Sequence, residues 1–283
     1  PGESVFNWQS VPQSRATAWV TTPIFDFFKG EHDGFRRLAS PAMHSRAVFL
    51  VKGEYVVVHD RIRGAGEHRG ALWLHWAPGS TVSHENQNIL NVQLAEPNAP
   101  RITAIIHAHG GDLSSEEGWV SPAYAVRAPA PVSVLRLDTS GSEDIVTVVA
   151  SSASCQRLVE SAFTPGSGSD AGVLTLELDA SVDTILSGPA SDSTHNEIVS
   201  DAGWTWVRRS PTGELLAFAI VGGSALTIGG CPLFHSDSIV DCAIGRRDGD
   251  GWRIELESPD RPSIISRLST TSGIEEPCAA SVE

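Results

Sequence analysis

The chain has 283 residues and a formal net charge of -14, with 41% hydrophobic and 19% charged residues. This composition is ordinary for a soluble globular protein, and no run approaches the roughly 18 apolar residues that a membrane-spanning helix needs. An acidic chain also lacks the concentrated basic surface that binds a phosphate backbone. The composition therefore argues against nucleic acid and against a membrane as partners.

Short apolar runs of strand length, bounded by turn-forming residues, follow one another from the start of the chain. Two β-branched runs, 44–51 and 55–62, flank Lys52-Gly53-Glu54, which predicts an antiparallel hairpin with glycine in the turn. A third run, 71–77, follows Gly64-Ala65-Gly66. No helical period persists for three turns. Further strand-length runs are 16–21, 24–28, 89–95, 101–108, 132–137, 145–150, 156–163, 172–178, 204–209, 214–221, 224–228, 238–244 and 252–257.

Asp60 is the unusual residue of the predicted hairpin. Side chains alternate faces along a strand, so Asp60 shares a face with Val56, Val58 and Ile62. An unpaired charge in such an apolar row is costly, and a buried carboxylate is therefore expected to be paired or bound to a metal.

Two interpretations of Asp60 are open. Arg46 and Arg69 are candidate partners, which would make it part of a structural ion-pair network. Alternatively, His44 and His75, on neighbouring predicted strands, form with Asp60 a polar cluster of the kind that binds metals or transfers protons. Their irregular spacing favours the structural interpretation, because structural ion pairs also produce such clusters.

Further along, Trp119 and Tyr124 flank Ser121-Pro122, and Arg127 follows. Aromatic rings stack on sugar faces, so these three residues are candidates for substrate contact. Packing in the core is the alternative, and the commoner role of large aromatic residues.

The turn signals and strand-length runs predict an all-β fold, an antiparallel multi-stranded β-sandwich of stacked sheets with little or no helix. We expect a β-sandwich over 1–180, a polar loop over 181–203, where small and polar residues gather, and a β-meander over 204–270 that completes or extends the sandwich. Residues 271–283 are expected to be a frayed tail.

Several segments in a fixed order resemble the heparinase II/III-like family of polysaccharide lyases. The resemblance covers about residues 1–135 and depends on the following segments: His32-Asp33-Gly34-Phe35-Arg36-Arg37-Leu38, Pro41-Ala42-Met43-His44-Ser45-Arg46, Tyr55-Val56-Val57-Val58-His59-Asp60-Arg61, Gly66-Glu67-His68-Arg69, Leu74-His75-Trp76-Ala77-Pro78-Gly79, and the run from Glu117 to Val132.

The resemblance implies the C-terminal β-sandwich portion of an enzyme that cleaves acidic, uronate-containing glycans by β-elimination. It implies an upstream α/α-toroid domain with the catalytic Asn or His and Tyr, and upstream segments that bind a divalent metal such as zinc. From this chain we therefore expect no catalytic residue, metal ligand or cofactor, and no activity in isolation. The implied partners are an acidic polysaccharide or oligosaccharide and the toroid domain, and the implied location is periplasmic or secreted. The alternative is a non-catalytic β-sandwich that binds carbohydrate or is structural.

The segment most similar to the family contains three further candidates for substrate contact, His32, Arg36 and Arg37. Asp33-Gly34 is a turn signal, so His32 is expected at a strand end. If a strand resumes at Phe35, the two arginines point to opposite faces. The alternative is that they form ion pairs with Asp33 or Asp60. Should the chain itself turn out to be active, the polar cluster of His32, His44, Asp60 and His75 is the expected site.

Overall fold

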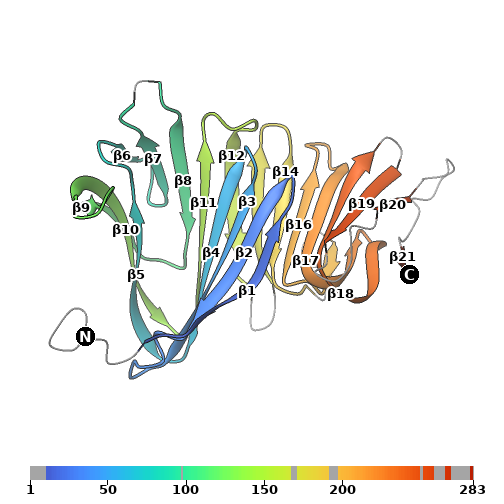
Figure 1. Cartoon of the computed structure of the whole chain (residues 1–283), viewed down its shortest axis with the longest axis horizontal. Helices are drawn as coiled ribbons and strands as arrows, with labels where there is room; N and C mark the ends of the chain where they lie inside the picture. The colour runs from blue at the N-terminus through green and yellow to red at the C-terminus, as the bar shows by residue number, and fades with distance from the viewer. Residues whose placement is uncertain are drawn as a thin grey trace. The chain divides into compact units, whose positions relative to one another are not determined.

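The computed structural model describes residues 11–96, 98–166, 171–190, 197–248, 251–257, 265–268 and 281–282. This part of the chain contains no helix, and hence none long and apolar enough to cross a membrane. Its strands form three sheets that are antiparallel apart from one short parallel pairing. The predicted all-β, antiparallel fold is confirmed. The chain divides into two compact units, Pro1–Arg157 and Leu158–Glu283, which are described separately below (Figure 1).

The first unit contains an eight-stranded sheet in the order β1-β2-β3-β4-β11-β8-β7-β6 and a three-stranded sheet in the order β5-β10-β9. The strands are β1 Ser14–Thr21, β2 Phe25–His32, β3 Ala42–Val51, β4 Tyr55–Gly64, β5 Glu67–His75, β6 Thr81–His84, β7 Ile89–Gln93, β8 Arg101–His107, β9 Asp112–Val120, β10 Ala128–Ser140 and β11 Glu143–Ser151.

Glycines set two turns of the first unit. The hairpin of β3 and β4 turns at Gly53, which has φ 78°, and the amide of Glu54 donates to the carbonyl of Val51 at 3.0 Å. This predicted hairpin is confirmed. At the other end of β4, Gly66 has φ 85°, and the chain leaves the eight-stranded sheet to enter the three-stranded sheet at β5. Left-handed backbone of this kind favours glycine because it has no Cβ.

The two sheets of the first unit stack through an apolar cluster. β7, β8 and β11 contribute Leu90, Ala104, Ile106 and Ile145, and the opposite sheet contributes side chains of β5, β9 and β10 such as Leu135. Strand alternation explains this, because residues two apart point to one face. The predicted stacking of sheets is thus present in this unit.

The cluster covers only part of the eight-stranded sheet. Cross-strand pairs share a face, and Asp60 pairs with Ile145, so Asp60 lies on the same face as the cluster. On this face, toward β2 and β3, apolar side chains give way to His32, His44 and Arg46. The candidate site lies there, beside the sandwich core.

The second unit is one ten-stranded sheet, with the main order β12-β13-β14-β16-β17-β18-β19-β20, to which β15 and β21 add at β17 and β18. Its strands are β12 Leu158–Thr164, β13 Gly172–Leu178, β14 Val182–Ser187, β15 Ile198–Ser200, β16 Trp204–Arg209, β17 Leu215–Ile228, β18 Cys231–Asp248, β19 Gly251–Glu257, β20 Ile265–Leu268 and β21 Ser281–Val282.

The long strands β17 and β18 bend. The two predicted runs 214–221 and 224–228 form the single strand β17, and its register with β18 shifts between Gly223 and Ala225. A bulge of this kind turns a strand and increases its twist. Phe218 and Leu226, from the two halves of β17, therefore belong to one buried cluster together with Phe234 of β18.

The boundary between the two units differs from the predicted domain boundaries. The units separate after Arg157, because β12, β13 and β14 pair within the sheet that contains β16. Within the predicted polar loop 181–203, β14 and β15 are strands, and Asp183 is fully buried. Its carboxylate accepts hydrogen bonds from Arg208 at 2.7 and 2.8 Å and from Trp206 Nε1 at 3.0 Å, which explains how a polar segment lies inside the protein. Apart from β21, the predicted tail 271–283 lies outside the described residues.

Candidate functional site: a polar network beside a groove

Strand register brings four polar side chains together on one face of the eight-stranded sheet. His32 of β2 pairs with His44 of β3, and Arg46 of β3 pairs with Asp60 of β4. Residues 44 and 46 are two apart, so both pairs point to the same side. The sequence shows each residue but not the pairing of β2 with β3 and β4, on which the arrangement depends.

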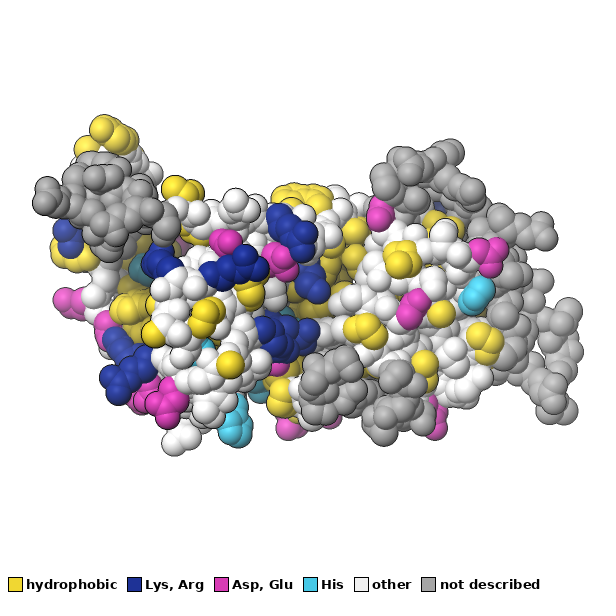
Figure 2. All heavy atoms as spheres, turned by 90° about the horizontal axis from the view of Figure 1, so that it is seen from below, with side chains coloured by type: hydrophobic (Ala, Val, Ile, Leu, Met, Phe, Trp, Pro, Cys, Tyr) yellow, Lys and Arg dark blue, Asp and Glu magenta, His cyan; other side chains and the backbone are white. Residues whose placement is uncertain are grey.

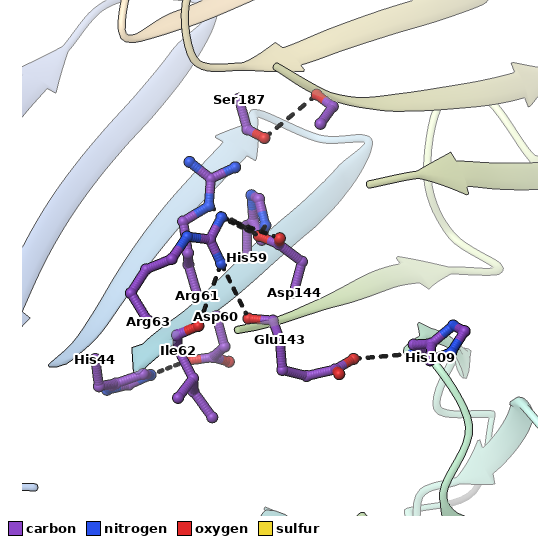
Figure 3. A network of polar contacts seen from close by, with 11 residues as sticks. His44, His59, Asp60, Arg61, Ile62, Arg63, His109, Glu143, Asp144 and Ser187 are labelled. Atoms are coloured by element: carbon purple, nitrogen blue, oxygen red, sulfur yellow. Dashed lines mark hydrogen bonds and ion pairs between the residues drawn. The ribbon is translucent and has the colours of Figure 1, made fainter. Parts of the chain in front are cut away.

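These side chains form a continuous hydrogen-bonded network. His32 Nε2 lies 2.9 Å from His44 Nδ1. His44 Nε2 in turn lies 2.6 Å from Asp60 Oδ1, a contact drawn in Figure 3. Arg46 donates to both carboxylate oxygens of Asp60, from Nε at 2.7 Å and from Nη2 at 3.0 Å. Asp60 is only 3% exposed. Its predicted partner Arg46 is confirmed, whereas Arg69 lies elsewhere, 3.5 Å from Asp138.

The protons of this network can be assigned from its ends. The backbone amide of Gly34 donates to His32 Nδ1 at 3.2 Å, so a neutral His32 carries its proton on Nε2 and donates it to His44 Nδ1. His44 Nε2 then donates to Asp60. A doubly protonated His44 would leave His32 with no proton on either nitrogen, which an imidazole does not sustain. Every ring nitrogen is therefore engaged, and neither ring presents a free basic nitrogen.

Burial and hydrogen bonds shift the pKa values of the network. Burial, and secondarily the neighbouring His44, lower the pKa of His32 below its usual value, which agrees with a neutral ring. Burial by itself would raise the pKa of Asp60, but hydrogen bonds from His44 and Arg46 outweigh it and hold that pKa below its usual value. Asp60 is thus an ion that the network stabilises.

The network does not fit a metal ion. Both oxygens of Asp60 accept from the Arg46 guanidinium, whose charge opposes a cation, and His44 has no free nitrogen. His75 is not a member, because β5 belongs to the three-stranded sheet, where His75 pairs with Val132. The predicted cluster therefore keeps His32, His44 and Asp60 and loses His75. Within the described ranges no group of three or more His, Cys, Asp and Glu side chains could hold a metal.

A shallow groove of about 410 Å³ runs beside this network. It is lined by residues of β1, β2 and β3, namely Ser14, Arg15, Ala16, Phe28, Gly30, Glu31, His32, His44 and Arg46. The ring of Phe28 lies where a side chain at residue 30 would be, since a Cβ on Gly30 would come within 2.7 Å of it. Arg15 donates to Glu31 at 2.7 Å at the rim. The groove thus combines an aromatic ring with cationic and imidazole side chains.

Arg46 connects the network to the groove. Its Nε and Nη2 atoms are bound to Asp60, and none of the described residues pairs with Nη1. The side chain is 44% exposed, so the outer edge of the guanidinium faces the groove while the inner edge is fixed. A guanidinium held in this way is pre-organised to donate to a carboxylate or sulfate. From the sequence, Arg46 is expected only as a partner of Asp60, and no sequence signal distinguishes Phe28 from other apolar strand residues.

A second network lies on the opposite face of β4. His59 Nε2 is 2.7 Å from Asp144 Oδ1, and Arg61 and Arg63 donate to the same carboxylate at 2.8 and 3.1 Å (Figure 3). Burial works against ionisation of Asp144, yet the hydrogen bonds from His59 and Arg61 lower its pKa strongly. Next to it, Glu143 accepts from the amide of His109 at 2.9 Å. No local sequence signal predicts these contacts, because Asp144 is 85 residues from His59.

Arg36 and Arg37 do not lie on a strand. β2 ends at His32 as expected, but the next strand begins only at Ala42, and residues 34–37 form a turn. The amide of Arg36 donates to the carbonyl of Asp33 at 2.9 Å, which closes the turn. The condition for placing the arginines on opposite faces, a strand that resumes at Phe35, is therefore not met. The Arg36 guanidinium lies 3.8 Å from Asp33 with the side chain 67% exposed, so the contact is weak.

The remaining candidates lie on the three-stranded sheet and the loop after β9. Trp119, on β9, is 52% exposed, and the Arg127 guanidinium stacks 3.9 Å from the centre of its ring. Tyr124 is fully exposed at 100%. The structure thus brings Trp119 and Arg127 into contact and places neither Trp119 nor Tyr124 in the core.

Charge on the surface is finely mixed. Figure 2 shows one face of the molecule. On the part of that face formed by the first unit, aspartate and glutamate lie beside several of the lysine and arginine side chains. Ion pairs of the first unit include Arg69 with Asp138 and Arg136 with Glu116. Among the described arginines of this unit, those without an acidic partner are the minority.

The first unit, with two stacked antiparallel sheets and a groove beside a buried ion network, is a β-sandwich module. The sequence model described as heparinase II/III-like, C-terminal, matches residues 6–160, just over half of the chain. The chain belongs to this family, as the sequence segments indicated. A comparison with curated proteins finds no match.

Solved structures with a similar fold include heparinases. A heparinase III gene product has 15% identity and a TM-score of 0.50, over 59% of this chain and 26% of its own. A second heparinase III structure has 15% identity and a TM-score of 0.50, over 60% and 26%. Heparan sulfate lyase HepC from Pedobacter heparinus has 17% identity and a TM-score of 0.49, over 59% and 26%. At such identities the likeness concerns the fold alone, and this chain spans about a quarter of the length of these enzymes.

Proposed function

We propose that the chain is the C-terminal β-sandwich portion of a polysaccharide lyase that cleaves acidic, uronate-containing glycans by β-elimination. In this proposal a helical α/α-toroid domain and the metal-binding segments precede the chain in the same protein. Support comes from the family match over residues 6–160 and from similar folds in heparinase III structures.

The single structural observation that carries the proposal is the half-exposed guanidinium of Arg46 at the groove. Asp60 fixes the inner edge of this guanidinium, and its free edge faces a groove with the Phe28 ring. An anionic sugar can place its carboxylate or sulfate on the guanidinium and an apolar ring face on Phe28.

The other roles of the reaction are not suited to the described residues of this groove. Abstraction of the C5 proton needs a free base, and both nitrogens of His32 and His44 are engaged. Tyr55, at 2% exposure, is buried on the face of β4 opposite to Asp60, and Tyr124 is in the loop after β9. The proposal therefore assigns the base and the acid to the upstream domain and assigns substrate binding to this chain.

The test is an assay on the complete natural gene product, with acidic and neutral polysaccharides compared. We expect new ultraviolet absorbance from the unsaturated product with heparan sulfate or alginate and none with a neutral glucan. Arg46→Ala is expected to raise KM with smaller effect on kcat, because the interaction is one of binding. A complete protein without turnover on any uronate polymer would refute the lyase assignment.

The alternative is a β-sandwich without a role in catalysis, which binds carbohydrate or is structural. The observation that favours it is the full engagement of both His–Asp networks, which resemble the structural ion pairs of many proteins. It predicts that Arg46→Ala lowers stability and leaves the KM of the complete protein unchanged.

A further inference from the structure

The face of β9 that packs in the core continues past the edge of the sandwich. Leu113 packs against the core cluster, and farther along the same face the hydroxyl of Ser115 is hydrogen-bonded to His84 of the edge strand β6 at 2.8 Å. Trp119 has the same parity as these residues and lies beyond that contact, where it is 52% exposed. One strand face thus changes from core to surface, and a tryptophan stands at that surface.

The cation stacked on Trp119 has no acidic partner among the described residues. Arg127 lies 3.9 Å from the ring centre, and no described carboxylate is within ion-pair distance of it. Most other arginines of the first unit have such a partner, including Arg46 with Asp60 and Arg136 with Glu116. In a chain with a net charge of -14, a stacked and unpaired guanidinium is a local site for an anion.

The loop between Trp119 and Arg127 is an ordered turn. The hydroxyl of Ser121 and the amide of Val126 both donate to the carbonyl of Ala123, at 2.8 and 3.0 Å. Ala125 has φ 60°, a left-handed conformation that costs a residue with a Cβ about 1 kcal/mol. Strained backbone of this kind is found at functional sites. Tyr124, in the same loop, is 100% exposed.

We propose that Trp119, Tyr124 and Arg127, the Trp119 ledge, form a subsite for an anionic sugar unit, separate from the groove at Arg46. The choice of a saccharide as ligand rests on the proposed function. The guanidinium edge donates to a carboxylate or sulfate, and the aromatic rings contact the apolar face of a sugar. Stacking on Trp119 immobilises the guanidinium beforehand, so less side-chain entropy is lost on binding.

The ledge and the groove lie on different sheets of the first unit. The groove is formed by β1, β2 and β3 of the eight-stranded sheet, whereas Trp119 is on β9 at the edge of the three-stranded sheet. In Figure 1 β9 lies at the end of this unit, away from β1, β2 and β3. The ledge is therefore a second contact, which holds a polymer at a distance from the groove.

The experiment measures binding of size-defined acidic hexasaccharides, from heparan sulfate and from alginate, to the 283-residue chain by isothermal titration calorimetry. The variants are Arg127→Ala, Arg127→Lys and Trp119→Ala. Arg101→Ala is the matched control for charge, because Arg101 is exposed and also lacks a described carboxylate partner. Trp73→Ala is the matched control for an exposed tryptophan. Thermal unfolding of each variant shows whether it is folded.

We expect Arg127→Ala and Trp119→Ala to weaken binding about tenfold or more, as for the loss of hydrogen bonds to a charged group. Arg127→Lys should lose most of this affinity too, because an ammonium lacks the planar, bidentate edge. Both controls should bind like the unaltered chain, and a neutral hexasaccharide should bind much more weakly.

Three results would overturn the inference: unchanged affinity in folded Arg127→Ala, an equal loss in Arg101→Ala, or equal binding of the neutral sugar. Its failure is distinguishable from that of the proposed function. If the complete protein shows lyase turnover and Arg127→Ala binds like the unaltered chain, only the proposed subsite at the Trp119 ledge is refuted. If Arg127→Ala loses binding but the complete protein shows no lyase turnover, only the proposed lyase activity is refuted.

Discussion

Two buried aspartates, Asp60 and Asp144, belong to adjacent strands and are stabilised in the same way. Each accepts from a histidine and from at least one arginine, and for each the hydrogen bonds outweigh burial and lower the pKa of the carboxyl. Each is thus an ion that the folded protein needs in its charged form. Removing a partner of a buried ion costs much more than removing a pair on the surface.

Arg46→Ala tests this at Asp60. We expect the free energy of unfolding to fall by about 2 kcal/mol, below the roughly 3–5 kcal/mol of fully buried pairs, because Arg46 is half exposed and His44 still donates to the carboxylate. Urea denaturation followed by circular dichroism measures the change. Arg15→Ala is the control, since its pair with Glu31 is exposed and should contribute less than about 1 kcal/mol. Equal effects of the two substitutions would contradict the account of Asp60.

The burial of His59 leads to a prediction about how the stability of the protein depends on pH. Burial lowers the pKa of His59, while Asp144 opposes this in part. Below the unfolded-state pKa of histidine, about 6.5, His59 binds a proton in the unfolded chain but not in the folded chain. The stability that is present above that pH is therefore lost as the pH falls toward the folded-state pKa.

We therefore expect His59→Gln to flatten the pH dependence of the melting temperature between about pH 7 and 5, because the amide keeps a donor for Asp144 and does not titrate. His75→Gln, at an exposed histidine, is the matched control and should keep the original curve. An unchanged curve in His59→Gln would show that His59 does not contribute to the pH dependence.

At the scale of elements, glycines mark where strands turn and where side chains pass over a strand. Gly53 and Gly245 represent the two situations. Gly53 has φ 78° and open space around a Cβ, whereas a Cβ on Gly245 would come within 2.1 Å of the ring of Phe218. Phe218 is fully buried and cannot move aside without displacing the core of the second unit.

We expect Gly245→Ala to lower the free energy of unfolding by about 3 kcal/mol through overpacking, and Gly53→Ala by about 1 kcal/mol through backbone strain alone. Chemical denaturation of both variants gives the comparison. If Gly53→Ala proved the more harmful, the proposed reason for a glycine in β18 would be wrong.

The turn between β2 and β3 leads to a prediction about its two exposed arginines. Arg36 and Arg37 are exposed, and the contact of Arg36 with Asp33 is long, so we expect Arg36→Ala and Arg37→Ala to change stability by less than about 0.5 kcal/mol. A contact with substrate would instead appear as weaker binding, by about 1.5–3 kcal/mol for a charged hydrogen bond. Paired measurements of melting temperature and glycan affinity decide between these roles. A large loss of stability would restore the interpretation of Arg36 or Arg37 as a structural ion pair.

At the scale of the whole molecule, the proposed function requires an acidic chain to bind an acidic glycan, which it can do only through a few local cations. Arg46 at the groove and Arg127 on the ledge are such cations, and the strongest networks of the first unit hold charge internally. Neither cation has a free base beside it in the described part of the chain. We therefore expect the 283-residue chain to bind acidic oligosaccharides without converting them, as followed by product absorbance. Turnover by this chain alone would contradict the proposed division of roles and direct attention to His32, His44 and Asp60.

The sequence by itself determined the fold class, the β3–β4 hairpin and the family. Strand-length runs with alternating apolar residues, and glycine between two β-branched runs, are local signals that short-range geometry makes dependable. It also singled out Asp60, because a carboxylate in an apolar row needs a partner wherever the chain folds. The sequence does not predict β14 as a strand, because its polar residue Asp183 is buried through hydrogen bonds to Arg208 and Trp206, which lie on a strand farther along the chain.

Only the tertiary structure decided which partners meet. Register across β2, β3 and β4 assigned Arg46, His44 and His32 to the Asp60 network, while the turn at Gly66 moved His75 to another sheet. The position of β6 decided that Trp119 lies beyond the core rather than in it. Composition and spacing are properties of one strand at a time, whereas these contacts depend on which strands pair and where a sheet ends, and that is set by burial over the whole unit.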